Sequence, residues 1–277
     1  MTDAPTVRLS ERVAALVGRE HPLITISSSL RDFVRSLAAP VVGAYQVCCS
    51  DESEKEAIAT FHLQFVRHLL PELKHFSRSA FRTINLGGRY ECGALAIAEH
   101  HYATPESEES FKVIAVKINS HVAAAGRPDG RFYGRMPRYD RHSLWCGALH
   151  AMLEGSDLPA IGELSQTFGA HRLATLRDLD DPQDIALRMA IANSVLQTQV
   201  VSADVDSFEA LTPTIYVIAS CVTFNRERED TELLAGLTLI DSRLPEKSCQ
   251  NVSLAADPAA YRFSYSGPFV TVSEESD

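Results

Sequence analysis

The sequence lacks the cysteine spacings that are typical of zinc ribbons, deaminase-type zinc sites and small disulfide-rich domains. Its 277 residues include six cysteines, none in a C-x-x-C pair, and two of them, Cys48 and Cys49, are adjacent. Structural zinc ribbons and disulfide frameworks both depend on such spacings. The spacing therefore excludes these classes, and we expect the six cysteines to be reduced thiols, as in a cytoplasmic protein.

Positive charge and long apolar runs are also scarce. The 26 Lys and Arg residues face 36 Asp and Glu, which gives a formal charge of -10 and a pI near 5.5. Such a surface repels phosphate backbones and anionic lipid, so nucleic acid is not an expected partner. No run approaches the roughly 18 apolar residues of a membrane span. Because residues 1–19 carry Asp3 and Glu11 without a signal-type apolar block, we expect a cytoplasmic protein without a membrane partner.

Several common catalytic motifs are missing as well. The chain has no Walker loop, no dinucleotide-binding glycine motif, no G-x-S-x-G elbow and no H-E-x-x-H pair. Each of these motifs places a phosphate, a nucleophile or a metal at a defined turn or helix. The most common nucleotide-binding, hydrolase and metalloprotease classes therefore have no support.

The composition itself is that of a globular protein, with 45% hydrophobic and 22% charged residues. We predict a single domain over residues 1–277, with a mainly helical part at 1–88, a hairpin-helix-hairpin part at 89–272 and a tail at 273–277. Helical spacing recurs in three N-terminal segments, and the apolar run that ends near Cys48 is also interpreted as helical. The three segments are 7–19, 30–37 and 58–69.

Alternating apolar residues predict two hairpins in the second part. Leu95 and Ile97 alternate with small residues and precede the apolar segment 111–122, which predicts a first hairpin; 214–224 and 231–241 predict a second. A further strand is expected within 261–272, and helices over Ser143–Glu154 and from Asp181 to about Gln199. Strands and helices do not alternate regularly, so we predict an α+β fold in which antiparallel β-hairpins form a sheet packed against several long helices.

A row of polar residues on one face of the first predicted hairpin is a candidate ligand-binding site. Lys117, Asn119 and His121 share a strand face, beside a neighbouring strand rich in alanine. Small side chains leave room for a ligand, while the row supplies a charge, an amide and an imidazole. The alternative is that the alanines pack closely against a helix and the polar row extends to solvent.

The connection that follows, 123–142, is glycine-rich, proline-rich and basic within an acidic protein. The planar guanidinium group of arginine binds carboxylate and phosphate through paired N–H donors, and tyrosine rings add surfaces for stacking. We therefore expect a small anionic ligand here. The alternative is pairing with surplus acidic residues of this chain or of a partner subunit. The residues concerned are Arg127, Arg131, Arg135, Arg138, Arg141, Tyr133 and Tyr139.

Cysteine and histidine chemistry is possible at the start of the next predicted helix. The helix dipole and the nearby arginines would favour a Cys146 thiolate, with His121 or His142 as its base. A metal site competes with this interpretation, because His142, Cys146 and His150 follow one another at four-residue steps and His121 could supply a further ligand to a zinc-like ion. A buried core cysteine is the simpler alternative.

Two functional hypotheses follow from these features. In the first, the chain is an enzyme that binds a small carboxylate or phosphate between the first hairpin and the arginine-rich loop, with Cys/His chemistry. In the second, it is a non-catalytic protein-interaction or oligomerisation module that uses the same loop, and a homo-oligomer is one form that such a module would take. The sequence favours the first hypothesis without deciding the reaction.

Overall fold

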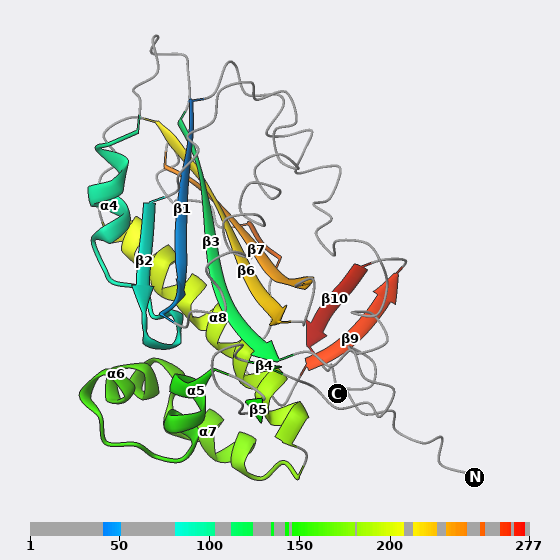
Figure 1. Ribbon diagram of the computed structural model, residues 1–277. Coiled ribbons are helices and arrows are strands. Elements are labelled where there is room, and N and C mark those ends of the chain that lie inside the picture. Colours follow the sequence, from blue (N-terminus) through cyan, green and yellow to red (C-terminus); the bar gives the residue numbers. More distant parts are fainter. Residues whose placement is uncertain are drawn as a thin grey trace.

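A six-stranded sheet forms the centre of the part of the chain that the computed structural model describes (Figure 1). The described residues are 41–50, 81–102, 112–123, 134–135, 142–143, 146–180, 182–207, 213–225, 231–242, 250–252, 261–266 and 269–274. The strand order is β2-β1-β3-β6-β7-β8. The strands are β1 (Val41–Cys49), β2 (Phe81–Asn85), β3 (Lys112–Ala123), β6 (Thr214–Asn225), β7 (Thr231–Asp241) and β8 (Gln250–Val252).

The first four strands in this order, β2, β1, β3 and β6, all run parallel, whereas β7 and β8 are antiparallel to their neighbours. The predicted α+β fold of antiparallel hairpins is therefore wrong, and the fold is α/β. Parallel strands are buried on both faces and read as nearly continuous apolar runs, without the alternation that marks an exposed strand. For this reason the apolar run ending at Cys48 and Cys49 was misassigned to a helix; it is β1.

The first predicted hairpin does not exist either. Its first strand is helix α4 (Ala94–Glu99), which buries Leu95 and Ala98 and leaves Ile97 67% exposed. Residues three and four apart share a helix face, so a short segment with Leu95 inward can be helical although its apolar residues also alternate. The second predicted hairpin is confirmed, because β6 pairs antiparallel with β7.

Two of the predicted helices are present with changed bounds. Helix α8 (Pro182–Ser207) begins at the expected proline and extends beyond Gln199, and α5 (Gly147–Leu153) begins later than expected. The expected C-terminal strand is two strands, β9 (Tyr261–Ser266) and β10 (Phe269–Glu274), which pair with each other. The helices predicted within 7–19, 30–37 and 58–69 lie outside the described residues, and the single-domain assignment stays a prediction.

Helix α8 packs against β3 and β6, and three short helices gather near one end of the sheet (Figure 1). These are α5, α6 (Pro159–Phe168) and α7 (Ala170–Arg177). Because parallel strands end at the same edge of a sheet, the carboxyl ends of β1 and β3 both point toward α5. None of the described helices is long and apolar enough to cross a bilayer.

A tight turn, η2 (Leu86–Gly88), lies against the carboxyl ends of β1 and β3. Gly88 has φ +69°, and a Cβ atom there would lie 2.7 Å from the Asn119 carbonyl oxygen. A side chain at Gly88 therefore meets both backbone strain and a rigid neighbour. Gly93 has φ +84° but nothing within 4 Å of a Cβ atom.

These two glycines predict different costs of substitution. Gly88→Ala should lower the free energy of unfolding by about 2–4 kcal/mol, because left-handed strain and a backbone clash add. Gly93→Ala should cost about 1–2 kcal/mol from the strain alone. Urea denaturation of both variants and the parent protein measures the difference, and equal costs would contradict the close approach of the turn.

Candidate metal centre

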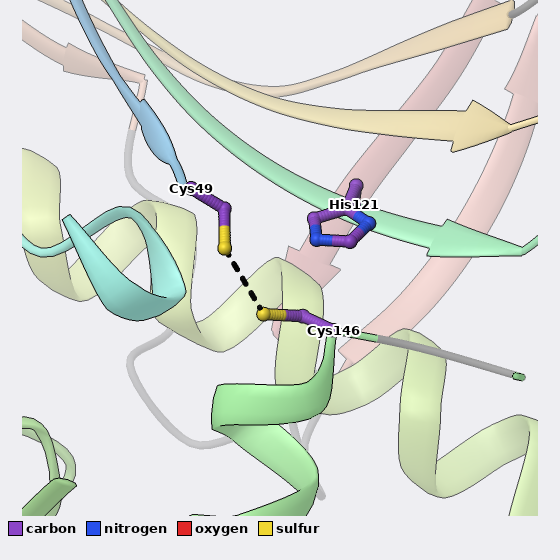
Figure 2. A group of neighbouring side chains, drawn as sticks. All are labelled: Cys49, His121 and Cys146. Carbon is purple, nitrogen blue, oxygen red and sulfur yellow. Dashed lines mark hydrogen bonds between the residues drawn. The ribbon is translucent and has the colours of Figure 1, made fainter. Parts of the chain in front are cut away.

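Two cysteines and a histidine from separate elements meet at the carboxyl edge of the parallel sheet (Figure 2). Cys49 is the last residue of β1, His121 lies near the end of β3, and Cys146 immediately precedes α5. Adjacent parallel strands bring residues that are distant in sequence to the same edge. The topology therefore assembles three ligand-type side chains that no local motif joins.

The three side chains are close enough to share one ion. Their ligand atoms all lie within 4.8 Å of one another, and the Sγ atoms of Cys49 and Cys146 are 3.4 Å apart. All three residues are buried, with at most 5% of their surface exposed. Among the described residues, this is the one group of at least three His, Cys, Asp or Glu side chains with such spacing.

The surroundings of the Cys146 thiol disfavour its deprotonation. Its hydrogen bond with Cys49, and then burial, raise the pKa of Cys146 well above the ordinary thiol value. The backbone N–H groups of Ala148 and Leu149 act in the opposite direction with smaller effect. The thiolate expected from the helix dipole is therefore not favoured, which argues against Cys146 as an activated nucleophile. A bound dication would reverse this, because a coordinating thiol loses its proton.

The donor set fits zinc. Two sulfurs and one imidazole nitrogen are the ligand types that zinc prefers, and these three ligands from the described residues would leave a fourth tetrahedral position for a further ligand. Two thiolates on one tetrahedral zinc lie about 3.8 Å apart when each Zn–S bond is about 2.3 Å. The observed 3.4 Å between Cys49 and Cys146 needs only a small separation to reach that value.

The surroundings of the cysteines are largely apolar. Cys49 and Cys146 belong to a buried cluster with Leu149 of α5 and with Met189 and Leu196 of α8. Apolar walls exclude water and lower the local dielectric, which strengthens charge interactions inside the site. A metal at this position would therefore act in a dry, low-dielectric environment.

Two of the metal-binding residues proposed from sequence lie here, and His150 does not. His121 and Cys146, predicted as catalytic and metal-binding residues, are brought together by β3 and α5. His150 is not part of the group: its side chain is 47% exposed and its Nδ1 lies 3.5 Å from a Glu154 carboxylate oxygen. The expected pairing of Cys146 with His150 fails because Cys146, the N-cap residue of α5, is buried, whereas the His150 side chain lies on the exposed side of that helix.

The predicted ligand-binding residues are only partly described. Lys117 and Asn119 lie on β3 upstream of His121 and are buried, so this row does not extend to solvent. Asn119 exchanges side-chain hydrogen bonds of 3.0 and 3.1 Å with Thr223 of β6. Arg135 and His142 pair through their backbones in the short strands β4 (Gly134–Arg135) and β5 (His142–Ser143). Outside the described residues lie Arg127, Arg131, Arg138, Arg141, Tyr133 and Tyr139.

Sequence reasoning missed Cys49. The run that ends near Cys48 is interpreted as helical from its sequence, and the absence of a C-x-x-C pair removes Cys49 from the metal candidates. The available signal was its place at the end of a continuous apolar run, just before polar residues. Such a run is typical of a buried parallel strand, and ligands gather at the carboxyl ends of those strands.

Solved structures share this fold although the sequence matches no protein-family model and no curated protein. PtLCIB4, a homologue of the limiting CO2-inducible protein LCIB, matches with a TM-score of 0.55 and 14% identity over 87% of this chain and 93% of its own. LCIB itself gives a TM-score of 0.45 at 14% identity over 82% and 93% of the two chains. A weaker likeness, with a TM-score of 0.37 at 13% identity over 68% and 79%, is to a tetrameric β-carbonic anhydrase of Sordaria macrospora.

The similarity to PtLCIB4 extends over most of both chains. At 14% identity it establishes a common fold. The chain therefore has the fold of an LCIB homologue, with a Cys-His-Cys group at the carboxyl edge of its parallel sheet.

Proposed function

We propose that this protein is a zinc-dependent enzyme that interconverts CO2 and bicarbonate, a carbonic anhydrase in the chemical sense. The observation that carries the proposal is the buried convergence of Cys49, His121 and Cys146 within 4.8 Å. Three protein ligands with one open position are typical of catalytic zinc, whereas structural zinc takes four. The fold shared with a homologue of a limiting CO2-inducible protein supports CO2 as the substrate.

In this proposal Cys49, His121 and Cys146 hold the metal. When bound, zinc supplies Lewis acidity and lowers the pKa of coordinated water to about 7, so that a nucleophile exists at neutral pH. The cysteine thiolates offset the charge of the dication, and His121 is expected to ligate as the neutral imidazole. The apolar cluster around Leu149 and Leu196 excludes bulk water and suits a small uncharged substrate.

Bicarbonate is itself a small carboxylate-like anion. The expectation of a small anionic ligand is therefore compatible with the proposed reaction. Whether the loop arginines contact that anion stays a prediction, because Arg127 and Arg131 lie outside the described residues. A homo-oligomer also stays a prediction, which light scattering of the purified protein would test.

The proposal is tested by stopped-flow CO2 hydration with zinc-loaded protein of measured metal content. His121→Ala should lower activity by at least about 100-fold, because even residues that only support a metal ligand contribute 10–100-fold. His171→Ala, at an exposed position on α7, is the matched control and should keep full activity. A parent protein with one zinc per chain and no hydration above the buffer rate would overturn the proposal.

A further inference from the structure

The turn η2, which follows β2 in the chain, lies against the ends of the two strands that carry Cys49 and His121. A Cβ atom on Gly88 would lie 2.7 Å from the Asn119 carbonyl oxygen and 3.4 Å from the backbone nitrogen of Cys49. The Ser50 N–H also donates to the Asn85 carbonyl oxygen at 3.1 Å, directly before the turn. The turn backbone therefore touches both strands at the place where their ligand residues lie.

One amide side chain of α8 fastens this turn to β3. The Nδ2 group of Asn193 donates to the Gly87 carbonyl oxygen at 2.7 Å and to Ser120 Oγ at 2.7 Å. Ser120 directly precedes His121 in β3. Both protons of a single amide are therefore used to hold the turn and the histidine-bearing strand together.

The position of Asn193 is otherwise unfavourable for a polar residue. It is 1% exposed, and its neighbours on α8, Met189, Ala192 and Leu196, pack with the cysteines in an apolar cluster. A buried amide costs free energy unless its hydrogen bonds repay desolvation, and an apolar residue of similar volume is the ordinary occupant of such a place. A specific geometric task explains an asparagine here better than core packing does.

We infer that Asn193 is a positioning residue for the metal centre: by clamping η2 to β3 it fixes the spacing between Cys49 and His121. This inference rests on the proposed zinc site and adds to it a residue that touches neither metal nor substrate. Groups that hydrogen-bond directly to a metal ligand and orient it typically change metal affinity by 10–100-fold. Asn193 reaches the two ligand residues only indirectly, through the turn on the Cys49 side and through Ser120 on the His121 side. We therefore expect an effect near the lower end of that range.

The test compares Asn193→Leu with Ser194→Ala. Leucine keeps the volume and removes both donated bonds, so zinc affinity, measured by chelator competition, should fall about tenfold. In the cobalt-substituted protein the sulfur-to-metal charge-transfer bands should shift. Ser194 is equally buried on the same helix, but its Oγ donates only within α8, to the Ile191 carbonyl oxygen at 2.9 Å, so its variant should bind zinc as the parent does.

Unchanged zinc affinity and an unchanged cobalt spectrum in folded Asn193→Leu would overturn the inference. If that variant fails to fold, Ser120→Ala removes one of the two acceptors with a smaller structural change, and the same weakening of zinc binding is expected. Parent protein that binds no zinc refutes the proposed function instead. In that case the Cys49 side of the clamp is still tested in metal-free protein by the rate of diamide-induced disulfide formation between Cys49 and Cys146. A displaced η2 would move the Cys49 backbone against which Gly88 lies, so equal rates in parent and Asn193→Leu count against the clamp.

Discussion

Replacing Cys146 with serine is expected to weaken zinc binding by at least about 100-fold, whereas the same replacement of Cys48 leaves the zinc affinity unchanged. Serine offers a hard hydroxyl in place of a soft thiolate and leaves only Cys49 and His121 as strong ligands. The magnitude exceeds the 10–100-fold that residues around a ligand typically contribute. Chelator competition under reducing conditions measures both affinities.

Cys48 is the matched control for this experiment because it is adjacent to Cys49, also buried and likewise not part of a disulfide. Its Sγ lies 3.9 Å from the Thr83 carbonyl oxygen of β2 and is not part of the group with His121. Successive residues of a strand point to opposite faces, so the two cysteines cannot both face Cys146. Equal loss of zinc in both variants would mean that general damage to the core, and not ligation, explains the effect of Cys146→Ser.

The parts of the fold that could be predicted are those set by local signals. The β6–β7 hairpin pairs two neighbouring segments whose apolar residue pattern predicts strands. Helix α8 begins at a proline, which is favoured in the first helical turn. The parallel pairing of β1 with β3 leaves no such local trace, because its partners are more than 60 residues apart in sequence. A continuous apolar run is compatible with a buried helix or a buried strand. The helical choice for the run that ends at Cys48 and Cys49, together with the hairpin predicted where α4 lies, led to the wrong fold class.

The candidate site could be predicted by residue type more readily than by geometry. His121 and Cys146 were recognised because imidazole and thiol are rare and chemically versatile. Cys49 was missed because it reaches Cys146 only through the sheet, across 97 positions of sequence. Asn193 has no sequence signal that sets it apart from the other polar residues of α8, and its two hydrogen bonds depend on elements that lie 73 and 106 positions away.

A second buried polar group lies at the opposite end of β3, where Glu99 meets Lys112, Thr214 and Tyr216. The Glu99 carboxylate accepts hydrogen bonds from Thr214 Oγ1 at 3.0 Å and from the Tyr216 hydroxyl at 2.9 Å. The Lys112 Nζ lies 3.8 Å from the same carboxylate and donates to the Glu99 carbonyl oxygen at 3.3 Å. All four residues are at most 2% exposed, so this network fixes the starts of β3 and β6 in the core.

Glu99→Leu is expected to lower the free energy of unfolding by about 3–5 kcal/mol, because removing one partner leaves a buried ammonium without its counter-charge. The double variant Glu99→Leu/Lys112→Met should recover most of that loss, since it removes the stranded charge as well. Urea denaturation of metal-free protein measures both. A double variant no more stable than Glu99→Leu would mean that lost packing, not charge, dominates.

The loss in Glu99→Leu should also depend on pH. Burial lowers the pKa of Lys112 from its ordinary value, while Glu99 partly restores it, so removing the carboxylate lowers this pKa further. At pH values between the pKa of Lys112 in the folded variant and its pKa in the unfolded chain, the unfolded chain binds more protons. The free energy of unfolding of the variant therefore rises with pH in that window. The stability difference between parent and variant should shrink as pH rises toward 10, the ordinary range of lysine. A difference that stays constant from pH 7 to about 10 would contradict a charged Lys112 as its cause.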